Sequence, residues 1–114
     1  MSTVCLLAGV LYTLVWTHSV EKIEWQEDWR AEGGKLILVE ARVQGSGAGM
    51  EPGEGAVLKD GVWRWQPRQA MLERVVLTQS PYVTGYLLCS QGDCRPLGQL
   101  APEADKITLT ALGC

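Results

Sequence analysis

The sequence predicts an all-β fold: a single small antiparallel β-sandwich or partly open barrel of about seven to eight short strands. Three observations support this. Apolar and polar residues alternate with a period of two along several segments. No segment carries the i, i+3, i+4, i+7 apolar stripe of an amphipathic helix. Turn-forming residues separate the alternating segments, and a chain of 114 residues has room for one β-rich domain, 1–114, with one core.

The first strands are predicted from "YTLVWTHSV" (12–20) and the segment that follows it. One face of the first strand carries every second residue: Leu14, Trp16, His18 and Val20. After a tight reversal, the apolar face of the second strand carries Ile23, Trp25, Glu27 and Trp29. Residues 35–43, "KLILVEARV", are apolar enough to form a central strand.

The remaining segments follow from turn chemistry and local composition. Residues 45–55, "GSGAGMEPGEG", contain too much glycine for a helix and predict a loop. Residues 56–65 predict a hairpin, because Asp60-Gly61 supplies the positive φ angles of a type I′ turn. Residues 67–73 predict one helical turn. Further strands are expected within 74–80, 82–89 and 106–112.

The charge of the chain excludes two classes of partner. Ten Lys and Arg stand against 13 Asp and Glu, and the basic residues are scattered singly. A nucleic acid or an anionic membrane surface would require a basic patch, so neither is expected. The uncharged run 4–16 is shorter than the roughly 18 to 20 residues of a membrane span, so no transmembrane segment is predicted. Met1-Ser2-Thr3 lacks the positive charge of a signal peptide, so we assign this run to the fold.

The four cysteines allow several interpretations. Cys89 and Cys94 flank the hairpin-like loop "SQGD" and could form a local disulfide, while Cys5 and Cys114 could join the two ends of the chain. Free thiols are the alternative. A metal site is disfavoured, since C-x4-C lacks the usual spacing and the chain has one His. Bridged cysteines would place the protein in the periplasm or another extracytoplasmic space, and reduced ones in the cytoplasm.

His18 and Glu27 are the most informative polar residues, because both lie on the apolar faces of adjacent predicted strands. A buried imidazole and a buried carboxylate need partners, and each could serve the other, with Glu21 as the second choice for His18. The pair is either a structural contact that fixes strand register or part of a ligand site. Ser19 faces away from His18 on a regular strand, so no catalytic residue is assigned and no enzyme is predicted.

Two further features could contribute to a binding site. The glycine loop lacks the Lys-Ser/Thr of a phosphate-binding loop, but Gly47 and Gly49 would let its backbone approach a ligand closely. Trp63 and Trp65 share one strand face and could form a protein interface or a sugar platform. No metal or cofactor is predicted. The candidate ligand-binding residues are His18, Ser19, Glu21, Glu27, Gly47 and Gly49.

Three stretches together resemble a bacterial family of unknown function, DUF1850. They are "YTLVWTHSVEKIEWQEDWR", "GGKLILVEARVQGSGAGMEPGEGAVLKDGVWRW" and "LLCSQGDCRPLG". The family signature appears here as His18 to Glu21, Gly45 to Met50 and Cys89 to Cys94. Members of the family are often encoded beside tripartite (TRAP) transporters. The resemblance therefore implies an accessory binding or interaction protein that works with a TRAP transporter component or its solute-binding protein.

Two other functions remain open from the sequence. One is a small-molecule or metal-binding domain that uses the His and Glu cluster. The other, which the sequence favours least, is a small hydrolase.

Overall fold

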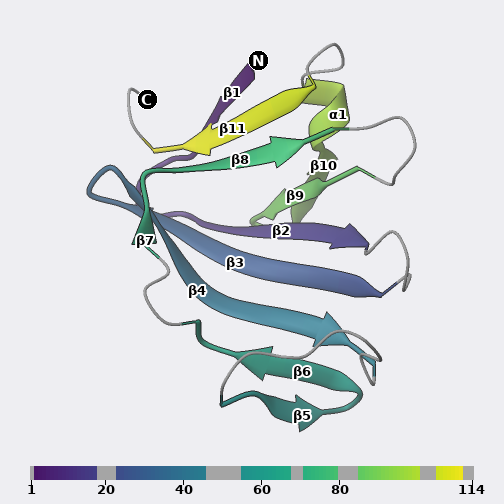
Figure 1. The fold of residues 1–114 in the computed structure, drawn as a ribbon. Coiled ribbons are helices and arrows are strands. Elements are labelled where there is room, and N and C mark those ends of the chain that lie inside the picture. Colours follow the sequence, from purple (N-terminus) through teal and green to yellow (C-terminus); the bar gives the residue numbers. More distant parts are fainter. Residues whose placement is uncertain are drawn as a thin grey trace.

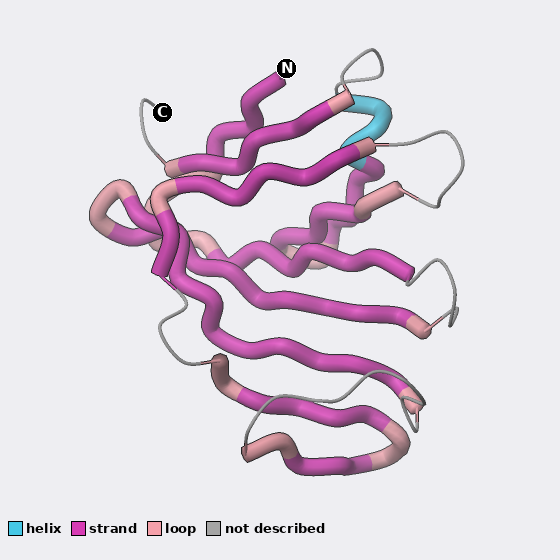
Figure 2. The backbone as a smooth tube through the Cα atoms, in the orientation of Figure 1, coloured by secondary structure: helices cyan, strands magenta, loops and turns pink. Residues whose placement is uncertain are grey.

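The computed structural model describes residues 2–17, 23–45, 55–67, 71–79, 85–100 and 105–111. Within these ranges the chain forms eleven strands and one helical turn (Figure 2). The strands are β1 (Ser2–Cys5), β2 (Leu11–Thr17), β3 (Glu24–Glu32), β4 (Lys35–Gln44), β5 (Val57–Lys59), β6 (Val62–Trp65), β7 (Met71–Leu72), β8 (Arg74–Thr78), β9 (Leu87–Ser90), β10 (Asp93–Pro96) and β11 (Lys106–Thr110). The helix is α1 (Leu97–Leu100). The all-β prediction is confirmed.

The strands form two sheets that do not close into a barrel (Figure 1). The large sheet has the order β10-β9-β2-β3-β4-β6-β5, with β7 also paired to β4, and all its neighbours are antiparallel. The small sheet has the order β1-β11-β8, in which β1 and β11 are parallel and β11 and β8 antiparallel. In Figure 1 the small sheet lies at one end of the large one. The fold is therefore an open sandwich.

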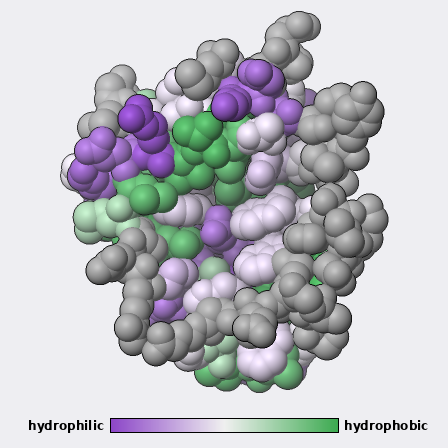
Figure 3. All heavy atoms as spheres, viewed as in Figure 1, coloured by the Kyte–Doolittle hydropathy of each residue, from purple (hydrophilic) through white to green (hydrophobic). Residues whose placement is uncertain are grey.

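The core lies between the small sheet and the neighbouring half of the large sheet. Figure 3 shows a hydrophobic patch, coloured green, in the upper part of the face that it presents. The buried members are Leu6, Leu14, Trp29, Ala31, Leu36, Leu77, Leu97, Ile107 and Leu109. The other half of the large sheet, toward β6 and β5, contributes no residue to this cluster among the described ones.

A β-bulge reverses which residues of β4 face the core. Trp29 of β3 pairs with Leu38, whereas its neighbour Asp28 pairs with Glu40, so Val39 is the extra residue. Inward-facing residues are therefore even-numbered before the bulge, as at Leu36, and odd-numbered after it, as at Ala41 and Val43. This is why β4 is apolar almost throughout but does not alternate cleanly.

The helical turn was predicted in the wrong place. Met71–Leu72, within the predicted turn 67–73, form β7 and pair with Ile37 and Leu36 of β4. Residues 68–70 of that segment lie outside the described residues. The helix instead follows β10, at Leu97–Leu100, where Leu97 is fully buried in the core. Pairing with β4 has overridden the local helical preference of Met71–Leu72.

Two of the predicted hairpin turns are present, and the predicted tight reversal after the strand 12–20 lies outside the described residues. Asp60 and Gly61 have φ angles of 52° and 78° and connect β5 to β6 through the pair Lys59–Val62, which confirms the type I′ prediction. Gln91 and Gly92 have similar φ angles, 54° and 82°, and connect β9 to β10. No helix in the described part of the chain is long and apolar enough to cross a membrane.

Candidate functional site

Glu27 projects from the inward face of β3, the face that also carries the core. Its direct neighbours are Leu14 on β2 and Ala41 on β4, which are 1% and 3% exposed. Along β3, Trp25 and Trp29 flank it on the same face, and Trp29 is 5% exposed. The strand alternation that predicted an inward-facing Glu27 is therefore correct. The carboxylate lies at the border between the core and the half of the sheet that contributes no described residue to the core cluster.

A line of four aromatic rings crosses the inward face next to Glu27. Trp16 and Trp25 are direct cross-strand partners, stacked with centroids 5.9 Å apart and planes 10° apart. Tyr86 adds a tilted contact to Trp16 at 6.0 Å, and Trp65 an edge-to-face contact to Trp25 at 5.9 Å. All four are half-buried, and such offset and edge contacts are the favoured geometries of aromatic pairs. We call Tyr86, Trp16, Trp25 and Trp65 the aromatic row.

At Trp65 the aromatic row turns toward the cross-strand line that contains Glu27. The backbone partner of Trp65 on β4 is Ala41, which in turn pairs with Glu27 on β3. The Trp65 ring nevertheless contacts Trp25, one strand further away, because the small Ala41 side chain leaves room for it to extend across β4. Glu27 therefore has the ring of Trp25 beside it and Trp65 two strands away in its own cross-strand line.

The carboxylate of Glu27 lacks a charged partner in the described part of the chain. Burial raises the pKa of Glu27, and the indole of Trp29 opposes this shift only partly. Burial also raises the pKa of Tyr86, with a further contribution from the negative charge of Glu27. Glu27 and Tyr86 are thus close enough to interact electrostatically. No Lys or Arg among the described residues forms an ion pair with Glu27.

Three indole N–H groups on this side of the sheet are buried and have no acceptor. They are Nε1 of Trp25, Trp29 and Trp63. Buried indole donors normally have a hydrogen-bond partner, since losing one costs about 1–3 kcal/mol. Trp29 lies near enough to Glu27 to lower its pKa, but no contact to the Nε1 atom qualifies as a hydrogen bond. Among the described residues, the inward face therefore holds three buried donors without an acceptor and a carboxylate without a charged partner.

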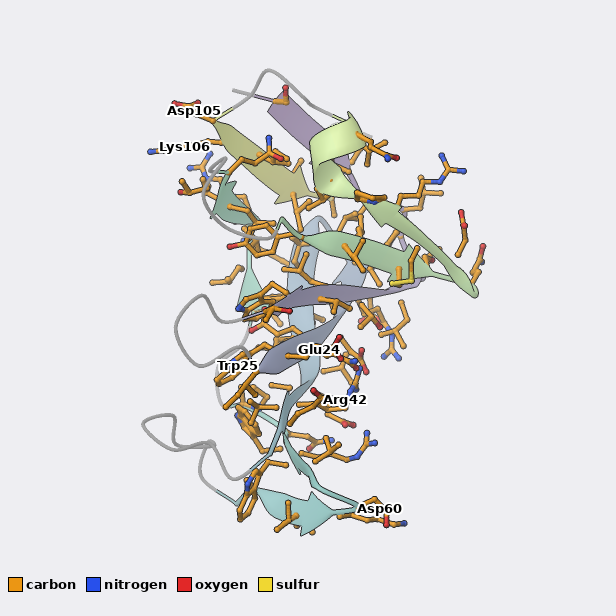
Figure 4. All side chains as sticks on the ribbon, turned by 90° about the vertical axis from the view of Figure 1, so that its right-hand side faces the viewer. Glu24, Trp25, Arg42, Asp60, Asp105 and Lys106 are labelled. Carbon is orange, nitrogen blue, oxygen red and sulfur yellow. A yellow bond between two sulfur atoms is a disulfide. The ribbon has the colours of Figure 1, made fainter. Side chains whose placement is uncertain are left out.

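On the outer face of the same strands, the polar and charged side chains are paired with one another. Arg42 donates to both carboxylate oxygens of Asp28 at 2.7 Å and to Gln26 at 3.0 Å, and Thr13 donates to Asp28 at 2.7 Å. Arg42 also contacts Glu40 at 3.3 Å. Figure 4 shows Trp25 on one side of the sheet and Arg42 on the other. Because this network satisfies its own charges, it resembles a structural element more than a binding site.

The candidate ligand residues predicted from the sequence are only partly described. Glu27 faces inward as expected, whereas His18, Ser19, Glu21, Gly47 and Gly49 lie outside the described residues. The predicted contact between His18 and a carboxylate stays a prediction. No group of three His, Cys, Asp or Glu side chains suited to a metal occurs in the described ranges.

Trp63 and Trp65, the predicted interface residues, are half-buried and lie on one face of β6. Trp65 belongs to the aromatic row, and the backbone of Trp63 pairs with Val43. Sequence reasoning did not include Trp16, Trp25 and Tyr86 in a site. The alternation placed the first two on the Glu27 face, but Tyr86 reaches them through the pairing of β9 with β2, for which the sequence carries no signal.

The predicted bridge between Cys89 and Cys94 is present. The two residues are direct partners on β9 and β10, with Cα atoms 4.0 Å apart, and their sulfurs form a disulfide. Cys5 is also disulfide-bonded. Cys114, its predicted partner, lies outside the described residues.

Comparison with known protein families gives a match over most of the chain. The model of the family described as "Domain of unknown function (DUF1850)" matches residues 12–97. The chain belongs to the DUF1850 family. The matched region of this DUF1850 protein contains Glu27 and the whole aromatic row, whereas β1 and β11 of the small sheet fall outside it. No curated protein and no solved structure matches the chain.

Proposed function

We propose that this DUF1850 protein is a binding domain that takes a small molecule on the aromatic row beside Glu27. The observation that supports this best is the Glu27 carboxylate, which has no charged partner among the described residues and lies next to half-buried aromatic rings. Of these rings, Trp16 and Tyr86 pack against the core cluster, whereas Trp25 and Trp65 do not belong to it. Large aromatic surfaces with a few polar groups at fixed positions are typical of ligand sites.

The unused indole donors support the same interpretation. Trp25 and Trp63 are brought into one cross-strand line by Val43, which pairs with both of them. Their Nε1 atoms are buried and have no acceptor among the described residues, so a ring that turns on binding to meet a ligand acceptor would recover an interaction that the unliganded domain lacks. A purely structural aromatic cluster gains nothing from leaving these donors unpaired.

Nuclear magnetic resonance tests this proposal. The five tryptophans give five indole N–H signals, which single Trp→Phe variants can assign. We expect fractions of a small-molecule extract from the native cells to shift the signals of Trp16, Trp25 and Trp65. The backbone signals of Asp28 and Arg42 on the outer face should stay in place. An extract that leaves all five indole signals unchanged would contradict the proposal.

We also propose that the domain acts as an accessory protein of a TRAP-type transporter, a role that the family resemblance implies. Cross-linking in native cells, followed by purification of the protein, tests this role. TRAP membrane subunits or their solute-binding protein should be enriched with the wild type and depleted with Trp63→Ala, a change at a predicted interface residue. Recovery of no transporter subunit with the wild type would refute the association.

A further inference from the structure

We infer that the ligand group recognised at Glu27 is a compact organic cation, an alkylammonium group that contacts the rings of Trp25 and Trp65. This inference rests on the proposed binding function and specifies its chemistry. It combines a carboxylate that has no cationic partner among the described residues with aromatic rings at its side.

Charge complementarity selects a cation. Glu27 lies between Leu14 and Ala41, so water cannot surround its carboxylate as it would at the surface. A buried carboxylate that stays ionised needs a positive partner, and the described residues supply none. An anionic ligand would add repulsion, and a neutral one would leave the charge unpaired.

The aromatic row selects an organic cation over a metal ion. A metal ion requires several oxygen, nitrogen or sulfur ligands, and no such cluster occurs in the described ranges. Indole faces attract cations through their quadrupole, Trp more strongly than Tyr or Phe. A quaternary alkylammonium group, unlike a primary one, has a weakly held hydration shell, so it can exchange water for ring faces at small cost.

The ring geometry provides more than one face. Trp25 and Trp65 meet at 85°, so their planes form two walls at nearly a right angle. Trp16 stacks behind Trp25 and fixes its orientation. A cation in this corner would contact both rings. Glu27 follows Trp25 by one alternation on the same strand face, and Trp65 extends over its neighbour Ala41, so the carboxylate can approach the same corner.

The test compares choline with its neutral carbon isostere, in which a quaternary carbon replaces the nitrogen. The two probes have the same shape, so a difference in affinity reports the charge alone. We expect choline to shift the indole signals of Trp25 and Trp65, and the isostere to bind at least about tenfold more weakly. Equal affinity for the two probes would overturn the inference.

Two matched variants test whether Glu27 supplies the negative charge that choline contacts. Glu27→Gln should weaken choline binding about tenfold or more, whereas Glu24→Gln, on the same strand but the opposite face, should leave it unchanged (Figure 4). Circular dichroism confirms that both variants fold. Unchanged binding by Glu27→Gln, or an equal loss in Glu24→Gln, would place the cation elsewhere and refute the inference.

The failure of this inference is separable from the failure of the proposed function. If neither probe binds, or the isostere binds as well as choline, the cation inference is overturned. In either case the proposed binding function still holds if a cell-extract fraction shifts the indole signals of the aromatic row. If no fraction does so, both are refuted.

Discussion

The guanidinium of Arg42 donates hydrogen bonds to both carboxylate oxygens of Asp28, each at 2.7 Å, across the outer face of β4 and β3. Their side chains are 13% and 15% exposed, which is unusual for an ion pair on the outer side of a sheet. Thr13 on β2 donates to the same carboxylate, so the contact joins three adjacent strands. We call this bidentate pair of Arg42 and Asp28 the clamp. It lies at the centre of the large sheet, on the face opposite the aromatic row.

Breaking the clamp should destabilise the fold. Asp28→Asn removes the charge that two guanidinium nitrogens contact and leaves Arg42 shielded from water, so the free energy of unfolding should fall by about 2 kcal/mol. The control is Asp93→Asn, whose partner Arg95 lies at 3.1 Å and where both side chains are 69% exposed. That change should cost less than about 1 kcal/mol. Urea unfolding curves of both variants measure the two losses in the free energy of unfolding. Equal losses would show that the clamp stabilises the fold no more than an exposed ion pair does.

The clamp also predicts an acid-sensitive contribution to stability. Burial alone would raise the pKa of Asp28, but hydrogen bonds from Arg42 and Thr13 and the positive charges of Arg42 and Arg64 hold it below its ordinary value of 3.8. A carboxyl group with a lowered folded-state pKa stabilises the fold above pH 3.8, and this contribution disappears as the pH falls through the lower pKa. In thermal unfolding, the melting temperature should fall less between neutral and strongly acidic pH in Asp28→Asn than in the wild type.

The contribution of Glu27 to stability should depend on pH in the opposite direction. Its pKa is raised from 4.5 by burial, so the folded state keeps its proton to a higher pH than the unfolded chain does. Stability from this group is complete below pH 4.5 and declines as the pH rises through the higher folded-state pKa. Among the described residues, Tyr86 is the titratable group coupled to it, and it stays neutral in this range. Glu27→Gln should therefore match or exceed the wild-type melting temperature at pH 7, and a lower melting temperature there would show that the carboxylate is a structural necessity.

The turn between β5 and β6 should tolerate little change. Gly61 has a φ of 78°, a conformation that strains any residue with a Cβ atom, so Gly61→Ala should cost about 1 kcal/mol even though nothing crowds the position. Gly85 is equally open but has no positive φ, so Gly85→Ala is a matched control that should be neutral or slightly stabilising. Chemical denaturation of both variants compares the costs, and a similar effect at the two positions would exclude backbone strain as the cause.

Alternation in the sequence was enough to place Glu27 on the inward face, because side chains on a strand change sides at every residue. It could not place the bulge at Val39, since an extra β-branched residue in an apolar strand leaves no mark on the pattern. It also could not bring Tyr86 beside Trp16, which depends on β9 pairing with β2 across more than 70 positions of sequence. Local chemistry thus predicts the turns and strand faces, while the site itself is assembled by long-range pairing.

The small sheet imposes an order on biosynthesis. Its central strand, β11, contributes Ile107 and Leu109 to the core and is the last strand of the described chain to leave the ribosome. Until then β1 has no neighbour to pair with in this sheet, and Leu14 and Trp29 lack part of their cover. A nascent chain that has completed every strand of the large sheet would still expose apolar surface and unpaired strand edges, the features that chaperones recognise and that cause aggregation. Folding of this protein is therefore bound to finish after translation of residues 106–110, however early its hairpins form.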